Sequence, residues 1–458
     1  MELNNNFVDF IQHHADMQGM TREEYVAHFL SERYENKILT FDEFIAEKFS
    51  NLQEALILEG GAAGHMPHPF EEKDLTFGDF KKIVTSGLQG ELNFEEVATE
   101  KTDGQNLLAT VKNGITMFSR NKGQLIAPVD LQGIIEFFTG HDSPLVEETY
   151  IYAATDLAEA LPKIKDQSVF NDGKDFVNIE LIYSKNPNVI YYERDVLQFH
   201  DIQETDGKGN IIGERKIAGE LVKALQEVSA DVQKTFTIIP PQILRLGKDM
   251  NFDKNQKKFI KQIEKLRDRY NLTDADEVSR YHEMWWRETI DTNFPSLSQD
   301  VKEGLLLRWA YDDKKSLNWR SLEKQVDSKE TSDLLKKFDK EDVKKKYKEN
   351  IRPFEDLFLE LGSIILKNAS NFVAANPEKE MQRLHNQIRT EADKIKKDGS
   401  VGQIERVMKE LERLERIGGV ESIIPTEGIV FVYKGKTMKL TGTFAAINQL
   451  MGIIKYGR

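Results

Sequence analysis

Hydrophobic positions over the first 90 residues recur at helical spacing. One apolar stripe consists of Ile45, Phe49, Leu52 and Leu56. Thr40 precedes Glu43, and Thr76 precedes Asp79, at the spacing of a capping box, in which a hydroxyl and an acid satisfy exposed backbone amides. The pattern predicts a helical N-terminal region over residues 1–90.

The pattern becomes mixed over residues 91–245. Two apolar runs flank Asn113-Gly114, a pair typical of a two-residue hairpin turn because both residues accept a positive φ. Further strands are expected at 150–153, 176–182, 189–192, 196–199 and 235–239. Helices are expected at 131–138 and 218–232. This combination predicts an α+β domain whose strands are largely antiparallel.

Charged helices with few strand signals follow over residues 246–422. Their apolar stripes consist of Phe354, Leu357, Phe358, Leu361, Ile364 and Ile365, then Met381, Leu384, Ile388 and Ile395, then Ile404, Val407, Met408, Leu411 and Leu414. Residues 423–458 return to a strand pattern with a turn at Lys434-Gly435. We therefore expect a large helical insert to interrupt one α+β domain, whose two parts are 91–245 and 423–458.

The composition narrows the class of protein. The chain has 458 residues, a net charge of -14 and no cysteine, which excludes disulfides and thiolate chemistry and fits a reducing cytoplasm. It contains no run of 18 apolar residues and no charged, then apolar, leader, so we expect no membrane contact. The acidic balance disfavours a protein that coats nucleic acid, and any polynucleotide contact is expected to be local.

The segment GGAAGHMPHPFE, residues 60–71, is a loop by its Gly and Pro content. His65 and His68 lie three apart, but no third metal ligand is close in the sequence and Pro67 breaks helical presentation. Three alternatives stay open for this loop: a metal site, contact with an active site, or plain packing.

The stretch EKTDGQN, residues 100–106, carries the main chemical candidate. A lysine amine can form a phosphoramidate with a nucleotide, and Gly104 lets a backbone approach closely. Alone, the pattern is weak, because Asp-Gly is a common turn and Lys101 could be a surface lysine.

The same stretch resembles the active-site motif of the covalent nucleotidyltransferases, the superfamily of polynucleotide ligases and mRNA capping enzymes. Glu100 and Asn106 make it most similar to the phage-type RNA ligases of the RNA ligase 2 class. Similar pieces follow in the family's order: Ser119-Arg120, Ile179-Glu180-Leu181, LQFHDI at 197–202, Glu427-Gly428-Ile429-Val430, and Lys439 in MKLTG.

The resemblance implies an antiparallel-sheet nucleotidyltransferase (ligase adenylation) fold and a role for each matching residue. Lys101 and Lys439 are the expected catalytic residues, with Lys439 also on the α-phosphate. Glu180 and Glu427 are the expected Mg²⁺ ligands. The expected ATP contacts are Glu100, Asp103, Gly104, Asn106, Arg120, Glu180, Phe199 and Lys439. The residues also make chemical sense together, because the transfer needs an amine, metal-binding carboxylates and cations on the phosphate.

Some of these residues have simpler explanations. Phe199 could pack in a core, where it would not stack on a purine, and Arg120 could be a solvated hairpin end. Asn106 could flank a turn. An acid such as Glu180 within an apolar strand is costly to bury unless it is used, which favours a functional role.

The last hairpin gives a prediction about register. A two-residue loop at 434–435 pairs Val430 with Lys439 and, by alternation, turns Glu427 to the opposite face. A longer loop or a bulge pairs Phe431 with Lys439 and brings Glu427 to the same face. Because both residues are expected in one site, we predict the second register.

The chain departs from the family pattern in three respects. Thr441 stands where the family has a second lysine, so Lys436 or Lys455 is a candidate replacement. Only 19 residues follow Lys439, too few for the extra domain of DNA ligases and capping enzymes, which favours an RNA ligase. The helical insert is also unusually long.

The insert contains two groups of residues with open roles. All four tryptophans lie in it: Trp285, Trp286, Trp309 and Trp319. They form either the core of the insert or stacking platforms for single-stranded nucleic acid. Basic runs at 254–269 and 336–348 are solvated helix faces or nucleic-acid contacts.

The expected function is an ATP-dependent RNA ligase that joins 5′-phosphate to 3′-hydroxyl ends through a lysyl-AMP intermediate. The resemblance implies a bacteriophage origin and the cytoplasm of a host cell. Two alternatives stay open. One is a nucleotidyltransferase with another acceptor, which is a DNA end, a cap-like end or a protein. The other is a binding or structural protein that has lost turnover.

Overall fold

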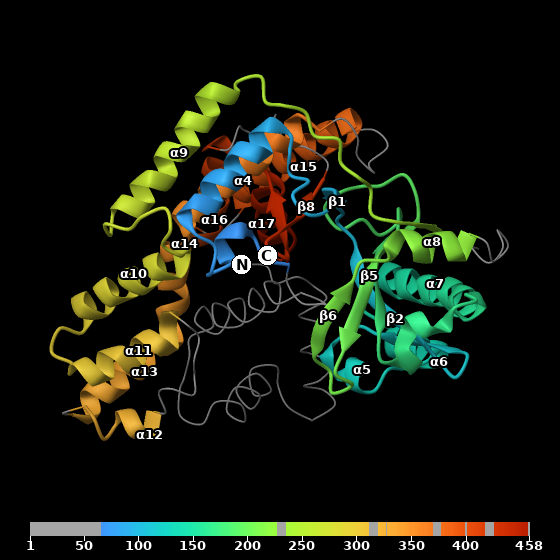
Figure 1. The fold of residues 1–458 in the computed structure, drawn as a ribbon, viewed down its shortest axis with the longest axis horizontal. Coiled ribbons are helices and arrows are strands. Elements are labelled where there is room, and N and C mark those ends of the chain that lie inside the picture. The colour runs from blue at the N-terminus through green and yellow to red at the C-terminus, as the bar shows by residue number, and fades with distance from the viewer. Residues whose placement is uncertain are drawn as a thin grey trace. The chain divides into compact units, whose positions relative to one another are not determined.

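Two antiparallel sheets carry the candidate motifs in the computed structural model (Figure 1). The structure describes residues 66–226, 235–310, 319–326, 328–369, 377–398, 401–416 and 426–456. All of them belong to one unit, residues 60–458. The expected helix after Thr40 and the candidate ligand His65 lie outside the described residues. The mixture of helices with antiparallel strands confirms an α+β protein.

The larger sheet has the strand order β3-β2-β4-β5-β6, with β7 pairing β5 in parallel. Its strands are β2 (Gln105–Lys112), β3 (Ile115–Ser119), β4 (Phe176–Ile182), β5 (Val196–Thr205), β6 (Ile211–Arg215) and β7 (Thr237–Ile239). Asn113 and Gly114 join β2 to β3 with φ values of 52° and 75°, so the predicted hairpin is confirmed. The strands predicted at 176–182, 196–199 and 235–239 are also present.

The smaller sheet has the order β1-β8-β9 and joins segments far apart in sequence. Its strands are β1 (Thr99–Lys101), β8 (Gly428–Tyr433) and β9 (Lys436–Thr441). Since β1 pairs with β8 and β2 belongs to the larger sheet, residues 102–104 form the link between the two sheets. Lys101 therefore ends one sheet next to the point where the other begins.

The predicted register of the last hairpin is wrong. Its turn has two residues, Lys434 and Gly435 at φ 53° and 70°, and Val430 pairs with Lys439. The prediction assumed that alternation governs Glu427. Pairing begins only at Gly428, so Glu427 lies outside the ladder. Alternation along the strand therefore does not determine which face its side chain occupies.

The other elements that the structure describes outside residues 252–416 are helical. They are α4 (Phe77–Gln89), α5 (Lys122–Ile126), α6 (Leu131–Phe138), α7 (Pro144–Ala160), α8 (Ala218–Gln226) and α17 (Phe444–Tyr456), with 3-10 turns η1 (Pro69–Glu71), η2 (Leu161–Lys163) and η3 (Gln167–Gly173). The Thr76–Asp79 capping box of α4 and the helix at 131–138 are confirmed. Of the helix predicted at 218–232, residues 218–226 are helical and 227–234 lie outside the described residues.

Two predicted strands are wrong. Residues 150–153 lie within α7, where the surrounding Ala, Glu and Leu favour a helix over a short apolar run. Residues 189–192 belong to no strand, because the amide groups of this segment bond a side chain where a strand would bond a neighbour.

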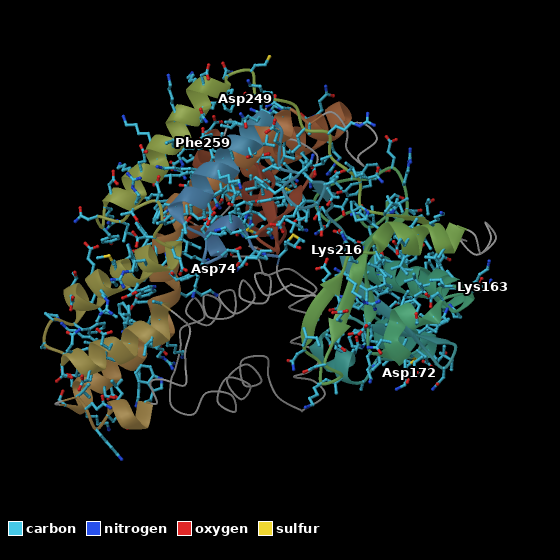
Figure 2. The ribbon with its side chains drawn as sticks, in the orientation of Figure 1. Asp74, Lys163, Asp172, Lys216, Asp249 and Phe259 are labelled. Carbon is cyan, nitrogen blue, oxygen red and sulfur yellow. The ribbon has the colours of Figure 1, made fainter. Side chains whose placement is uncertain are left out.

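Helices joined by turns and loops make up the described part of residues 252–416. Its helices are α9 (Phe252–Asp268), α10 (Val278–Asn293), α11 (Gln299–Ala310), α12 (Trp319–Leu322), α13 (Lys329–Glu341), α14 (Val343–Lys367), α15 (Pro377–Asp398) and α16 (Val401–Arg416). Several of them share apolar clusters with the rest of the unit. Phe259 of α9, fully buried, packs in one cluster with α4, α14 and the strands β8 and β9 (Figure 2). A second cluster joins α15, α16 and α17 to residues 182–196.

The tryptophans of the helical segment form a core. Trp286 and Trp309 are 1% and 5% exposed and pack with Phe294 and Phe338, so they cannot serve as stacking platforms. Trp285 and Trp319 are partly buried against the same cluster. No helix in the described part of the chain is long and apolar enough to cross a membrane.

Candidate active site

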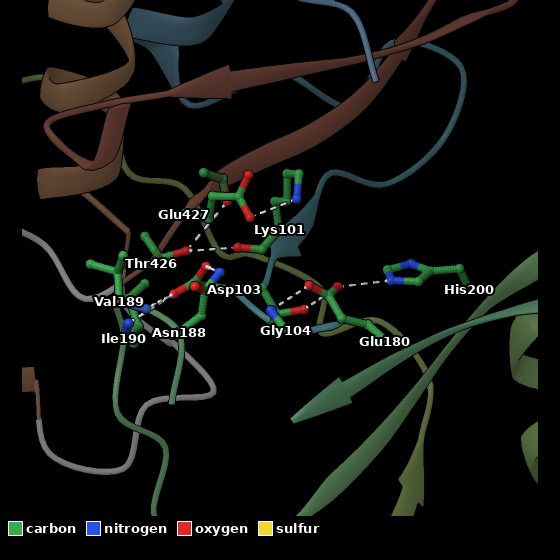
Figure 3. A network of polar contacts seen from close by, with 12 residues as sticks. Lys101, Asp103, Gly104, Glu180, Asn188, Val189, Ile190, His200, Thr426 and Glu427 are labelled. Carbon is green, nitrogen blue, oxygen red and sulfur yellow. Dashed lines mark hydrogen bonds and ion pairs between the residues drawn. The ribbon is translucent and has the colours of Figure 1, made fainter. Parts of the chain in front are cut away.

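Lys101, the last residue of β1, forms an ion pair with Glu427. Its Nζ lies 2.6 Å from Glu427 Oε2 (Figure 3). Backbone pairing of Lys101 with Gly428 brings the two side chains together, and Thr426 Oγ1 donates to the Lys101 carbonyl. Both side chains are partly exposed, at 20% and 14%. The smaller sheet thus positions an amine and a carboxylate at its edge.

The carboxylates around Lys101 keep its amine protonated. Burial lowers the pKa of Lys101, but the charges of Glu427 and Glu180 outweigh burial and raise that pKa above its usual value. The lysine therefore carries a proton in this arrangement, and nucleophilic chemistry requires that the ion pair with Glu427 first be broken.

Glu180 on β4 holds the link between the two sheets. Its Oε2 accepts from Thr102 Oγ1 at 2.6 Å, and its Oε1 accepts from the Gly104 amide at 2.8 Å. A Cβ on Gly104 would lie 2.6 Å from Glu180 Cγ and 2.7 Å from the Leu181 carbonyl. Glycine was expected here for approach to a nucleotide, but the structure shows that it permits approach to β4.

His200 of β5 contacts the same carboxylate. Its Nε2 lies 3.1 Å from Glu180 Oε2. Burial on its own would raise the pKa of Glu180, but the bond with His200 and the charge of Lys101 lower that pKa to about 2. Glu180 is thus an anion throughout the neutral range.

Asp103 is buried, and its carboxylate and backbone amide form hydrogen bonds with residues 188–192. Its carboxylate accepts from Asn188 Nδ2 at 2.8 Å and from the amides of Val189 and Ile190 at 2.7 and 2.8 Å, and its own amide donates to Tyr192 Oη at 2.9 Å. Burial and the charge of Glu427 raise the pKa of Asp103 to about 7, although the two amides lower it. Its oxygens fasten residues 188–190, and the expected contact with ATP stays a prediction.

Lys439 of β9 lies in the same electrostatic environment. It is 9% exposed, and its amide donates to the Pro67 carbonyl at 2.9 Å. Burial and the charge of Lys101 lower the pKa of Lys439, whereas Glu427 and Glu71 raise it, and the net shift is downward. Residues 67–71 of the expected loop thus contact the strand of a candidate catalytic residue.

Asn106 and Arg120 lie on and beside β2. Asn106 pairs with Glu180 across the strands and donates from Nδ2 to Asn178 Oδ1 at 2.5 Å, while its buried Oδ1 accepts no hydrogen bond from the described residues. Arg120 stacks its guanidinium over the Tyr150 ring at 5.4 Å, and Tyr150 Oη donates to the Asn106 carbonyl. Both residues thus lie around the strand that follows the lysine turn.

Two expected ATP contacts point elsewhere. Phe199 pairs with Ile179, while Glu180 pairs with Gln198, so Phe199 faces the opposite side of the sheet from Glu180. It is fully buried in the core beneath α6 and α7, so the expected stacking on a purine is corrected. Glu100 is also fully buried, and alternation along β1 turns it away from the side of Lys101.

Glu180 and Glu427 fit the expected magnesium site in donor chemistry. Mg²⁺ takes one or two protein carboxylates and keeps waters or phosphates as its other ligands. Both carboxylates act electrostatically on Lys101, so both lie near the same amine. Among the described residues no group of three or more His, Asp or Glu side chains could hold a metal by itself, which leaves the candidate ligand His68 without such a cluster.

The other expected cations have acidic partners or lie outside the description. Lys436 pairs with Glu72 and with Asp74, and its candidate role in place of a second lysine stays a prediction. The side chain of Lys455 lies outside the described residues. In the basic runs, Lys258 pairs with Glu360 and Lys336 with Glu323. A nucleic-acid contact by these runs stays a prediction.

Four residues of this arrangement were not predicted from the sequence. Thr102, His200 and Gln198 surround Glu180, and Tyr192 holds the Asp103 amide. His200 and Gln198 lie one position either side of Phe199, so alternation would have found them had the register of β4 and β5 been known. Tyr192 carried no such signal.

The chain was compared with known proteins. No model of a known protein family matches it, and neither does any curated protein or solved structure.

Proposed function

We propose that this chain is an ATP-dependent nucleotidyltransferase of the RNA ligase type, with Lys101 as the covalent nucleophile. The observation that carries the proposal is the Lys101–Glu427 ion pair at the junction of two antiparallel sheets, next to a turn that Glu180 anchors. The order of the resembling motifs supports the choice of ATP and of polynucleotide ends.

The proposed reaction has three transfers at phosphorus. Lys101 Nζ, after losing its proton, attacks the α-phosphorus of ATP, forming a P–N bond while the bond to pyrophosphate breaks. An oxygen of a 5′-phosphate end then attacks the same phosphorus, and the P–N bond breaks. Last, a 3′-hydroxyl attacks the 5′-phosphorus, a phosphodiester forms and AMP leaves.

Each nearby charge has a role in this proposal. Glu180 and Glu427 would hold Mg²⁺, which offsets the charge of the phosphates when bound. Glu427 would have to leave the ion pair before Lys101 could act, because the protonated amine is not a nucleophile. Lys439 is buried, and the nearby charge of Lys101 helps to lower its pKa. In the proposed reaction Lys439 would stabilise negative charge on the α-phosphate.

A ligation assay tests the proposal. RNA with a labelled 5′-phosphate is offered as a single strand, on a splint and in a nicked duplex, with DNA equivalents, together with Mg²⁺ and ATP or GTP. We expect joined RNA with ATP and none in Lys101→Ala. Nucleotidyl transfer to DNA, a cap-like end or protein would favour another acceptor. No reaction with any acceptor, combined with measurable nucleotide binding, would favour a protein without turnover, for which Thr441 is the motivating departure.

A further inference from the structure

Residues 188–192 connect the lysine turn to the helical segment. On one side, the amides of Val189 and Ile190 donate to the buried carboxylate of Asp103 (Figure 3). On the other side, the carbonyl of Val189 accepts from Arg383 Nη2 of α15 at 2.7 Å. One peptide segment therefore lies between a carboxylate of the turn and a guanidinium of a helix that the family resemblance does not cover.

We infer that Arg383 is a positioning residue for Lys101, so that α15 is part of the nucleotidyl-transfer apparatus. The catalytic consequence rests on the proposed function. The structural connection between α15 and the lysine turn rests on contacts alone. Arg383 acts through Val189 and Asp103 and is not itself a catalytic residue.

The contacts are charge-assisted at both ends. The Val189 carbonyl and the Ile190 amide belong to one peptide unit, so a guanidinium at the carbonyl and a carboxylate at the amide polarise that unit in the same direction and each strengthens the other bond. Asp103 stands between Thr102 and Gly104, which both donate hydrogen bonds to Glu180. Loosening residues 188–190 would therefore release Asp103 and shift the turn that sets the position of Lys101.

Apolar packing supports the same connection. Val189, Ile190 and Tyr192 share a buried cluster with Leu384 and Ile388 of α15. Arg383 precedes Leu384, and its Nη1 also donates to Gln387 Oε1 at 2.8 Å within the helix. The guanidinium is thus held in place by α15 itself, and α15 is held against residues 189–192 by its buried face.

Hydrogen exchange tests the structural half without any nucleotide. Arg383→Met removes the donors and keeps the aliphatic stem. We expect the amides of Val189 and Ile190 to exchange about tenfold faster or more, because exchange reports local opening. Arg383→Lys, which keeps one donor, should recover part of the protection. Arg389→Met, an exposed position on the same helix, should match the parent protein. Equal exchange at 189–190 in all three variants would overturn the inference.

Nucleotide kinetics test the catalytic half. In Arg383→Met the maximal rate of lysyl-nucleotide formation should fall about tenfold with nucleotide affinity nearly unchanged, since a displaced nucleophile slows the chemical step. An unchanged rate alongside faster exchange would overturn the positioning role. If no variant and no parent protein forms an adduct, the proposed function fails, and the exchange data still decide the structural connection. If Arg383→Met does not fold, the Arg383→Lys pattern decides both.

Discussion

Lys101 and Glu427 lie 326 positions apart in sequence, yet their side chains meet at 2.6 Å. The pairing of β1 with β8 produces this contact by joining a strand near the start of the described chain to one near its end. Every charge assigned to the proposed reaction lies around this pair.

Glu427→Gln should lower the pKa of Lys101. Burial lowers that pKa and the carboxylate of Glu427 is the largest opposing influence, so its removal shifts the balance downward. The pH dependence of amine labelling at Lys101 measures the shift. Adduct formation should nevertheless slow tenfold or more, since a proposed metal ligand and electrostatic partner is lost. A Lys101 pKa that stays unchanged would show that the ion pair does not form in solution.

Gly104→Ala should destabilise the protein by about 1–3 kcal/mol, because the new methyl group meets Glu180 Cγ at 2.6 Å and a backbone carbonyl at 2.7 Å. Urea unfolding measures the change. Gly402→Ala is the control, since nothing lies within 4 Å of its Cβ and alanine favours the α16 helix. Equal stability of the two variants would contradict the close approach of the turn to β4.

Gln198→Met should stabilise the protein by about 1 kcal/mol or more, because an unsatisfied buried amide costs about 1–3 kcal/mol. Gln198 is fully buried, and neither polar atom of its side chain bonds a described residue. The contrasting variant is Gln167→Met, which should destabilise, since Gln167 Nε2 donates to the Leu161 and Ile164 carbonyls. Loss of stability in Gln198→Met would mean that the amide has a partner.

Stability should fall as the pH drops from about 6.5 to 4, partly because of His282. Burial lowers the pKa of this histidine to about 4, while its Nδ1 lies 3.1 Å from Asn350 Oδ1. The unfolded chain therefore binds a proton through this window that the folded chain does not, and unfolding gains up to about 3 kcal/mol. Above pH 6.5 the histidine is neutral in both states and the effect vanishes.

His282→Gln keeps a hydrogen-bonding group and removes the titration. Thermal or urea unfolding at a series of pH values should show a shallower acid limb for this variant than for the parent protein. Parallel curves between pH 4 and 6.5 would show that His282 is accessible to protons in the folded state.

The elements predicted correctly are those whose signals lie within a few neighbouring residues. The helix 131–138, the strand 176–182 and the Asn113-Gly114 hairpin all follow from periodicity and turn residues, and the structure has them. The helix at 150–153 was missed because four apolar residues fit a strand or a helix equally well. Residues 189–192 were missed because their partner is the Asp103 side chain, about 86 positions earlier.

The arrangement of the candidate site depends on the register of the sheets, which could not be predicted from the sequence pattern. Residue types and motif order suggested Lys101, Glu180, Glu427 and Lys439 as one group. Whether Phe199 faces that group depends on the pairing register of β4 and β5. A shift of one residue in that register would turn every side chain of the strand to the opposite face of the sheet. The same limit explains the missed His200, whereas the hairpin register was wrong because Glu427 lies outside the ladder.

Locating a covalent nucleotide adduct tests the central claim most directly. The protein is incubated with Mg²⁺ and ATP labelled at the α-phosphate, denatured, digested, and the labelled peptide is sequenced by mass spectrometry. We predict label on Lys101, resistant to denaturation and absent from Lys101→Ala. No covalent label, or label that persists in Lys101→Ala, would contradict the account.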